Sequence, residues 1–326
     1  MRRVTYKRSD DEEFATQPAV DVAQPALYVG PEPRSAILAA VVAGGARVVT
    51  DPAEAAAVIW TGKGVEDLMR LLHDGIGWVQ LPDAGVERWL TAGILDGRRT
   101  VTSARGCFGP QVAEHAIALL LAGSRRLQFA ARANSWPEDR VWGTTLRGRD
   151  VVILGGGDVG RHLARMLVPF GASTTVVTRR GLPVPDATRT IPVDRLHEGL
   201  LDAAALVVAA PATPETRHLI GERELGCLRP GAVLVNVARG SLVDPVALLA
   251  ALDTGQLGAA ALDVTEPEPL PTGHPLWEHP RVLITPHVAN PPETKEQGLA
   301  ELVRENTLRF VDRQELLAVV DPTRGY

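Results

Sequence analysis

The stretch DVVILGGGDVGRHLARML, residues 150–167, most constrains how this chain can fold. A short apolar run leads directly into Gly155-x-Gly157-x-x-Gly160, and an amphipathic helical pattern follows at once. In such a turn the first glycine permits the tight bend, the second lets the backbone approach a pyrophosphate, and the third allows close packing of helix on strand. The helix N-terminus then faces the phosphate charge. A plain glycine turn is the alternative. The strand before and the helix after favour a dinucleotide site that also includes Asp158 and Val159.

Strand and helix patterns alternate on both sides of this turn. Strand-like runs occupy 26–29, 47–50, 57–60, 78–81 and 100–103, then 150–154, 174–178, 205–210, 232–238, 260–264 and 281–285. Helical patterns cover about 110–132 and the segment from about 291. Continuous apolar strands are typical of parallel sheets covered by helices on both faces, and 326 residues suffice for two domains. We therefore expect two doubly wound α/β domains, the second inserted into the first. The expected segments are 1–104, 105–290 and 291–326, the last returning to the first domain.

Composition and charge exclude several classes of protein. The net charge of −5 argues against a nucleic-acid partner. No apolar run approaches the roughly 18 residues that a membrane span needs, and residues 1–24 form a charged lead-in, expected to be mobile, without a signal-peptide core. Cys107 and Cys227 are too few and too far apart for a disulfide framework or a metal cage. We expect a cytoplasmic protein without a bound metal, membrane or nucleic acid.

The second strand of the predicted dinucleotide domain bears on which cofactor would bind. An NAD site usually ends this strand with Asp or Glu, which bonds the ribose 2′-hydroxyl. Here the strand ends in Thr178, Arg179 and Arg180, with no acid. Guanidinium groups bind a 2′-phosphate, whereas a carboxylate would repel it. The arginines could instead simply begin an exposed loop. Because the acid is also missing, the sequence favours NADP(H) over NAD(H).

Three later strands each lead into an ionisable residue. Arg239, Asp263 and His287 follow the runs AVLVNVA, AAL and RVLIT. A single histidine at a strand end is usually just a polar residue beginning a loop. In an open parallel sheet, however, ligands bind outside the carboxyl ends of the strands. Glu268, five residues beyond Asp263, can fold back over the same edge. The four together predict a catalytic site that includes His287.

This set of motifs resembles the D-isomer-specific 2-hydroxyacid dehydrogenase family over nearly the whole chain. The motifs are LPDAGVE (81–87), AEHAIALLL (113–121), GGGDVG (155–160), PATPETRHLI (211–220), LRPGAVLVNVARGSLVD (228–244), ALDVTEPEPL (261–270) and HPLWEHPRVLITPH (274–287). The resemblance, close to glyoxylate/hydroxypyruvate reductases, implies a Rossmann dinucleotide domain inserted into a flavodoxin-like substrate domain. It implies a homodimer, with residues around 110–145 as the contact.

The resemblance also implies roles for individual residues. Arg239 would bind the substrate carboxylate and keto oxygen, and His287 would be the acid/base with Glu268 as its partner. Asp263 would hydrogen-bond the nicotinamide carboxamide. The remaining cofactor residues would be Pro211, Thr216, Val237 and Ala238, and backbone N–H groups around Ala84 and Gly85 would complete the carboxylate site.

The implied activity is NAD(P)H-dependent reduction of a small 2-ketoacid to a D-2-hydroxyacid, or the reverse. The sequence leaves open which ketoacid is used and in which direction the reaction runs. Asp83, beside the carboxylate turn, would either disfavour doubly charged substrates or point away. Two alternatives remain: a dinucleotide-sensing, co-repressor-like binding protein, and oxidation of another small anion such as phosphite.

Overall fold

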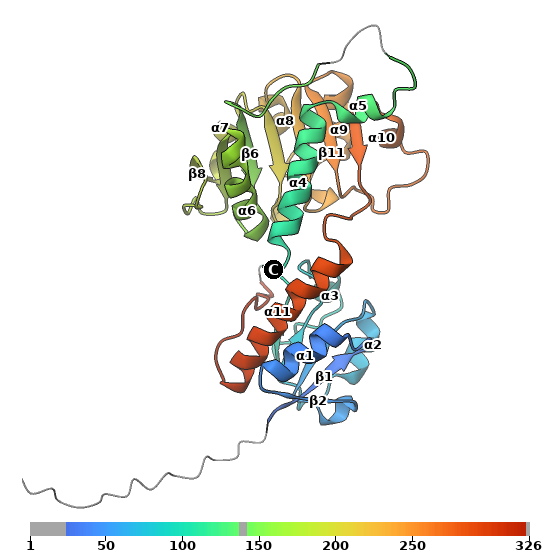
Figure 1. Cartoon of the computed structure of the whole chain (residues 1–326), viewed down its shortest axis with the longest axis vertical. Coiled ribbons are helices and arrows are strands. Elements are labelled where there is room, and N and C mark those ends of the chain that lie inside the picture. The colour runs from blue at the N-terminus through green and yellow to red at the C-terminus, as the bar shows by residue number, and fades with distance from the viewer. Residues whose placement is uncertain (1–23, 137–141, 324–326) are drawn as a thin grey trace, which may run out of the picture.

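The computed structural model describes residues 24–136 and 142–323. Two lobes meet at a narrow waist, and each lobe is built on one parallel sheet (Figure 1). The lead-in predicted over residues 1–24 lies outside the described residues, apart from Gln24. The expectation of two parallel α/β domains is confirmed.

The smaller lobe holds a five-stranded sheet in the order β2-β1-β3-β4-β5, with every pairing parallel. Its strands are β1 (Ala26–Gly30), β2 (Arg47–Val49), β3 (Ala57–Trp60), β4 (Trp78–Gln80) and β5 (Thr100–Thr102). Its helices are α1 (Ser35–Ala43), α2 (Val65–Leu71), α3 (Glu87–Thr91) and the last helix of the chain, α11 (Pro292–Val311). This strand order is that of flavodoxin-like folds.

The end of the chain returns to this smaller lobe. Helix α11 packs against α1, and its residues Leu299 and Val303 are buried in the same apolar cluster as Ile37. Beyond α11, the Val320 N–H donates to the Val101 carbonyl at 2.9 Å, beside strand β5. The larger lobe is therefore an insertion in the smaller one. The exact boundary residues stay a prediction. Phe108, from the predicted inserted segment, packs in the apolar cluster of the smaller lobe.

The larger lobe holds a seven-stranded parallel sheet in the order β12-β11-β10-β9-β6-β7-β8. Its strands are β6 (Asp150–Leu154), β7 (Ser173–Thr178), β8 (Arg189–Pro192), β9 (Ala205–Val208), β10 (Ala232–Asn236), β11 (Leu257–Leu262) and β12 (Val282–Ile284). Its helices are α4 (Gly109–Ser124), α5 (Leu127–Ala131), α6 (Asp158–Leu167), α7 (Leu196–Leu200), α8 (Glu222–Cys227), α9 (Pro245–Asp253) and α10 (Pro275–Glu278). Counted from β6, the order 3-2-1-4-5-6 with a further edge strand is that of a Rossmann domain.

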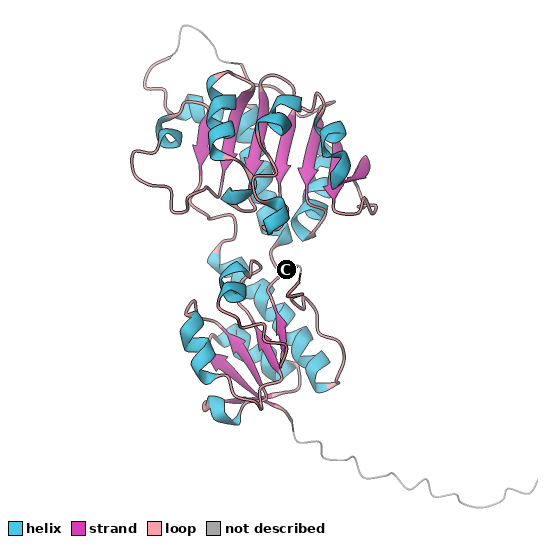
Figure 2. Cartoon of the chain, turned by 180° about the vertical axis from the view of Figure 1, so that it is seen from behind, coloured by secondary structure: helices cyan, strands magenta, loops and turns pink. Residues whose placement is uncertain are grey.

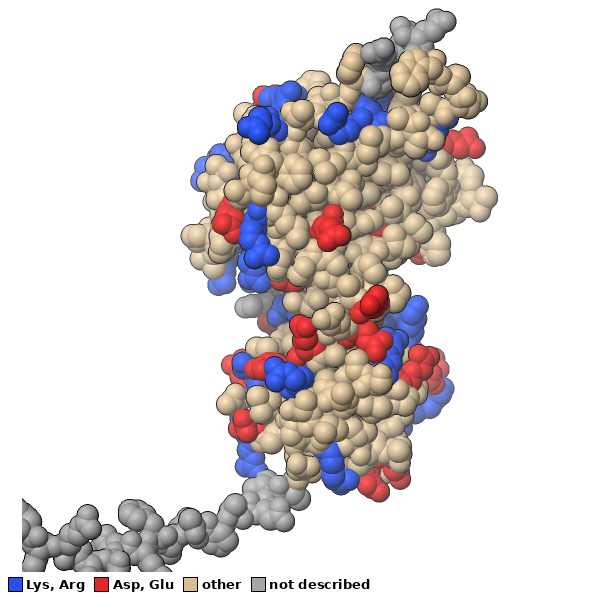
Figure 3. All heavy atoms as spheres, viewed as in Figure 1, with Lys and Arg blue, Asp and Glu red and all other residues tan. Residues whose placement is uncertain are grey.

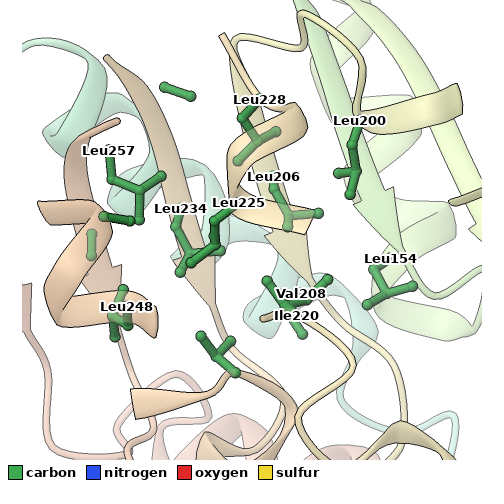
Figure 4. Close-up of a cluster of buried hydrophobic side chains, with 14 of the residues drawn as sticks. Leu154, Leu200, Leu206, Val208, Ile220, Leu225, Leu228, Leu234, Leu248 and Leu257 are labelled. Atoms are coloured by element: carbon green, nitrogen blue, oxygen red, sulfur yellow. The ribbon is translucent and has the colours of Figure 1, made fainter. Parts of the chain in front are cut away.

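Both faces of the larger sheet are covered, which explains its nearly continuous apolar strands. One face packs on α7, α8 and α9 through a leucine-rich cluster that includes Leu206, Leu225 and Leu234 (Figure 4). The opposite face packs on α4 and α6 through residues such as Leu120 and Leu163. Removing a buried leucine from such a core typically costs about 2–5 kcal/mol. The strand ends are thus carried by a sheet that is packed on both faces.

Two local features differ from the sequence prediction. The single helix expected over 110–132 is interrupted, because Arg126 adopts a left-handed conformation (φ 58°) between α4 and α5. Its guanidinium donates to the Gly258 carbonyl at 2.6 Å, which fixes the bend against the sheet. Strand β8 was not predicted, since its sequence RTIP is short and ends in proline.

None of the helices in the described part of the chain is long and apolar enough to cross a membrane. On the face shown in Figure 3, basic and acidic side chains are interspersed over both lobes.

Candidate active site

The strands of the larger sheet run towards the smaller lobe, so their carboxyl ends face the waist (Figure 2). Strands β10, β11 and β12 are neighbours in the sheet. Arg239, Asp263 and His287 each follow one of these strands within a few residues. The ionisable residues predicted from three separate motifs therefore lie along one stretch of the sheet edge.

His287 and Glu268 form a pair at this edge. The imidazole Nδ1 lies 2.7 Å from Glu268 Oε1. Both side chains are partly open to solvent, 51% for His287 and 39% for Glu268, so a small molecule can reach them. Among the described residues nothing hydrogen-bonds the imidazole Nε2. A carboxylate on Nδ1 fixes the ring orientation and leaves Nε2 as the atom for proton exchange.

Asp263 holds the turn that carries His287. Its buried carboxylate accepts from the Val288 N–H at 3.0 Å, the Ala289 N–H at 3.1 Å and the Thr285 hydroxyl at 2.6 Å. His287 itself has φ 54°, a left-handed conformation that costs a non-glycine residue free energy unless its surroundings impose it. The carboxylate therefore imposes the turn geometry. Its predicted bond to a nicotinamide carboxamide stays a prediction.

Arg239 reaches across the waist to the smaller lobe. The Asn236 amide donates to the Arg239 carbonyl at 2.8 Å and so shapes the turn after β10. The guanidinium Nη1 donates to the Ala238 carbonyl at 2.8 Å, and Nε lies 3.3 Å from Glu87 Oε1 at the start of α3. The third nitrogen, Nη2, lies directly over Gly85, where a Cβ would collide with it. The turn at Ala84 and Gly85, which is predicted to bind the substrate carboxylate, therefore faces Arg239.

The glycine-rich turn fits a phosphate ligand. A Cβ at Gly155 or Gly160 would collide with neighbouring backbone, so close packing accounts for these two glycines. A Cβ at Gly157, by contrast, would meet no atom within 4 Å. Gly157 caps the N-terminus of α6, where helix N–H groups and the helix dipole favour an anion. Open space at this glycine is what close approach of a pyrophosphate requires.

Asp158, inside this turn, does not face the open space over Gly157. Its carboxylate lies against Gly109 at the start of α4, and Oδ1 lies 3.3 Å from His162 Nδ1. With Val159 in the first turn of α6, Asp158 can contribute its backbone to the predicted phosphate site.

The other predicted cofactor residues line the same edge. Thr178 ends β7, and its hydroxyl accepts from the Gly181 N–H at 2.9 Å. Arg179 and Arg180 follow as exposed side chains. After β9, the Thr216 hydroxyl donates to the Pro211 carbonyl at 2.8 Å. Val237 and Ala238 lie between β10 and Arg239.

Glu266 ties two of these loops together. It lies 2.7 Å from Arg217 Nη1 and 2.6 Å from His218 Nε2, in the loop after β9. Burial alone would raise the pKa of Glu266, but the hydrogen bonds from His218 and Arg217 outweigh it and lower the pKa overall. The ionised carboxylate therefore holds the loop after β9 against the loop after β11, which also carries Glu268.

Several site residues were not singled out from the sequence. Glu87 pairs with Arg239, and His115 on α4 lies 3.3 Å from Asp263 Oδ1. Both fall inside the motifs LPDAGVE and AEHAIALLL, which is the only signal that could have found them. Asp83 is now placed as well. It lies 3.3 Å from Lys295 of α11 and also pairs with Arg88, so nearby cations offset its charge.

The larger lobe and its strand-end site define a dinucleotide-binding Rossmann domain facing a second α/β domain. Residues 117–289 match the family described as "D-isomer specific 2-hydroxyacid dehydrogenase, NAD binding domain". This match covers more than half of the chain, and the chain belongs to that family.

Individual relatives agree with this placement. A protein from Corynebacterium melassecola is 35% identical over 87% of this chain and 94% of its own length. A glyoxylate reductase from Thermococcus gammatolerans is 36% identical over 61% of this chain and 62% of its own length. The crystal structure of a D-isomer specific 2-hydroxyacid dehydrogenase from Xanthobacter autotrophicus Py2, in complex with NADPH and MES, superposes with a TM-score of 0.81. That structure is 29% identical, over 93% of this chain and 100% of its own. The prediction of an oxidoreductase of this family is confirmed.

Proposed function

We propose that this chain catalyses NAD(P)H-dependent reduction of a small 2-ketoacid to a D-2-hydroxyacid, or the reverse. The observation that carries the proposal is the His287–Glu268 pair on the sheet edge that also bears Arg239 and the open turn at Gly157. Family membership supports a dinucleotide-dependent oxidoreductase. A glyoxylate reductase among the relatives supports a small ketoacid as substrate.

The roles of the residues follow from their chemistry. A bound reduced dinucleotide would supply hydride to the keto carbon. Protonated His287 would donate a proton from Nε2 to the keto oxygen as negative charge grows there, with Glu268 holding Nδ1. Arg239 would hold the substrate carboxylate through Nη2, with help from backbone N–H groups around Ala84 and Gly85.

We also propose that NADP(H) is preferred over NAD(H). Arg179 and Arg180 are exposed at the end of β7, where the ribose 2′-position lies in Rossmann domains. No carboxylate pairs with either guanidinium among the residues that the structure describes. The Xanthobacter autotrophicus relative was solved with NADPH, which agrees with this choice.

The cellular setting completes the proposal. We expect a cytoplasmic enzyme that is a homodimer through the segment around residues 110–145, of which 137–141 lie outside the described residues. A binding protein that senses the dinucleotide is the second candidate, and turnover separates it from the enzyme.

The test is oxidation of NADPH and NADH at 340 nm against glyoxylate, hydroxypyruvate, pyruvate and bulkier 2-ketoacids. Turnover of a small ketoacid, with the D-isomer of the hydroxyacid as product on a chiral column, is the expected result. Cofactor binding without turnover of any ketoacid would favour the binding protein, and phosphite-dependent reduction of NADP⁺ or NAD⁺ would favour oxidation of that anion.

A further inference from the structure

Helix α4 contacts the turn around His287 at two places. The Gln111 side-chain amide donates to Asn290 Oδ1 at 3.1 Å, after His287 in the sequence. One helical turn further along α4, His115 Nε2 lies 3.0 Å from Thr285 Oγ1, before His287. Residues four apart lie on the same face of a helix. One face of α4 therefore contacts both ends of the turn formed by residues 285–290 (the catalytic turn), which carries His287.

The direction of the hydrogen bonds at Thr285 is fixed by chemistry. An ionised carboxylate can only accept, so the Thr285 hydroxyl proton points to Asp263 Oδ1, 2.6 Å away. The hydroxyl oxygen is then left to accept, and the nitrogen facing it, His115 Nε2, must carry a proton. The same nitrogen lies 3.3 Å from Asp263 Oδ1. The order is therefore His115 N–H to Thr285 hydroxyl to Asp263 carboxylate, which in turn holds the backbone N–H groups after His287.

Helix α4 is also the element shared by the two lobes. Val112, in its first turns, is buried with residues of the smaller lobe, whereas Ala116 and Leu120 are buried against the larger sheet. Gln111 and His115 lie within this transition. Because α4 packs against both lobes, a side chain on this part of the helix can link the position of the turn around His287 to the relative position of the lobes.

We propose that His115 is a positioning residue for His287. It donates from Nε2 to Thr285 and so fixes Asp263 and the left-handed turn that Asp263 holds, with Gln111 securing the far end of that turn. The proposal rests on the proposed function of His287 as acid/base. The role belongs mainly to kcat, because His115 contacts the turn that carries the proton donor and not the turn at Gly157 or Arg239. Of the predicted cofactor residues it reaches Asp263, whose predicted bond to the nicotinamide carboxamide is one among several cofactor contacts.

The first experiment compares His115→Ala with His115→Gln, whose side-chain amide can still donate near the position of Nε2. A misplacement of about 1 Å can cost on the order of 100-fold in rate, and loosening one of several supports should cost about tenfold. We expect kcat to fall about tenfold in His115→Ala, with KM for the ketoacid and Kd for NADPH within about twofold of wild type. His115→Gln should recover most of kcat.

Two further variants separate positioning from general damage. His197→Ala removes a partly exposed histidine that is similarly bonded to a carboxylate, Glu224 at 2.8 Å. His197 lies on α7, which covers the face of the larger sheet opposite to α4. It should leave kcat unchanged. Thr285→Val removes the hydroxyl between His115 and Asp263, and the double variant with His115→Ala should be no slower than the slower single variant, since both break the same chain of bonds.

A second readout does not need activity. In ¹⁵N-histidine NMR of the cofactor-free protein, His115 should show the Nε2–H tautomer in wild type, and its signal should move in Thr285→Val. An Nδ1–H tautomer would overturn the proposal. So would a folded His115→Ala with kcat within twofold of wild type, or a loss that His115→Gln does not restore and that equally affects NADPH binding. If wild type turns over no ketoacid, the proposed function fails, while the NMR result still decides the bonding at His115.

Discussion

Replacing Glu87 by glutamine tests whether the ion pair across the waist competes with substrate. Glu87 Oε1 lies 3.3 Å from Arg239 Nε, and Oε2 lies 2.7 Å from the position that a Cβ on Gly85 would take. The space over Gly85 is where the substrate carboxylate is proposed to bind. The ketoacid must therefore displace the Glu87 carboxylate or bind beside a like charge.

The magnitude follows from the exposure of the pair. The side chains are 37% and 46% exposed, so the pair contributes about 0.2–1 kcal/mol, as solvent-exposed pairs do. At about 1.4 kcal/mol per tenfold change, losing this competition should tighten binding roughly 1.4- to 5-fold. We expect Glu87→Gln to lower Kd for oxamate, an unreactive carboxylate analogue, and KM for the ketoacid, with little change in kcat. The gain should shrink with added salt.

The matched control is Glu66→Gln, which breaks an exposed pair with Arg70 at 3.2 Å on α2 and should leave both constants unchanged. Isothermal titration with oxamate gives Kd, and initial rates give KM. An increase in both constants for Glu87→Gln would refute the reasoning, because it would mean that Glu87 orients Arg239 for substrate rather than competing with it.

Further tests address the acid/base, the cofactor, a partly buried thiol and a loop contact. His287→Gln should lower kcat about 10²–10⁴-fold while NADPH binding, followed by fluorescence, is retained; near-normal turnover would contradict its role. Arg179→Asp should lower the ratio of kcat/KM for NADPH over NADH by about tenfold, or about 1.4 kcal/mol, and an unchanged ratio would show that the arginine only borders a loop. Burial, and then the charges of Asp158 and Glu301, raise the pKa of Cys107 to about 12. In the variant Cys227→Ser, which leaves Cys107 as the remaining cysteine, alkylation of Cys107 by iodoacetamide at pH 8 should be at least about 100-fold slower in the folded protein than after unfolding in urea. Because the pKa of Glu266 is lowered in the folded protein, the ionised carboxylate stabilises the fold at pH values above the usual glutamate pKa. This stabilisation is lost as the pH falls through the lowered pKa, so the difference in Tm between wild type and Glu266→Gln should shrink between pH 6 and pH 3.

The residues at the strand ends could be predicted because parallel strands impose a common geometry. The runs AVLVNVA, AAL and RVLIT predict strands of one parallel sheet, and this places Arg239, Asp263 and His287 at one edge. The three glycines of the phosphate turn similarly predict a dinucleotide site. The tight turn, the approach of a pyrophosphate and the packing of helix on strand each require a glycine at a defined position.

Contacts that depend on how separate elements pack could not be predicted. His115 is 170 residues away from Thr285 in the sequence, and their bond follows from the exact rotation of α4 over the sheet. Glu87 meets Arg239 only because the two lobes face each other. The bend at Arg126 was missed for a related reason: its anchor, the Gly258 carbonyl, belongs to a strand far along the chain.

The insertion of one domain into the other sets an order of events while the chain is being synthesised. All seven strands of the larger sheet lie between Asp150 and Ile284, so that sheet can form once its last strand has left the ribosome. The smaller sheet is made first but needs α11, the last helix, to cover Ile37 and its neighbours. Domains tend to fold as units during synthesis. The lobe whose strands are translated first is therefore completed after the other one, and its apolar face stays uncovered until α11 has been synthesised.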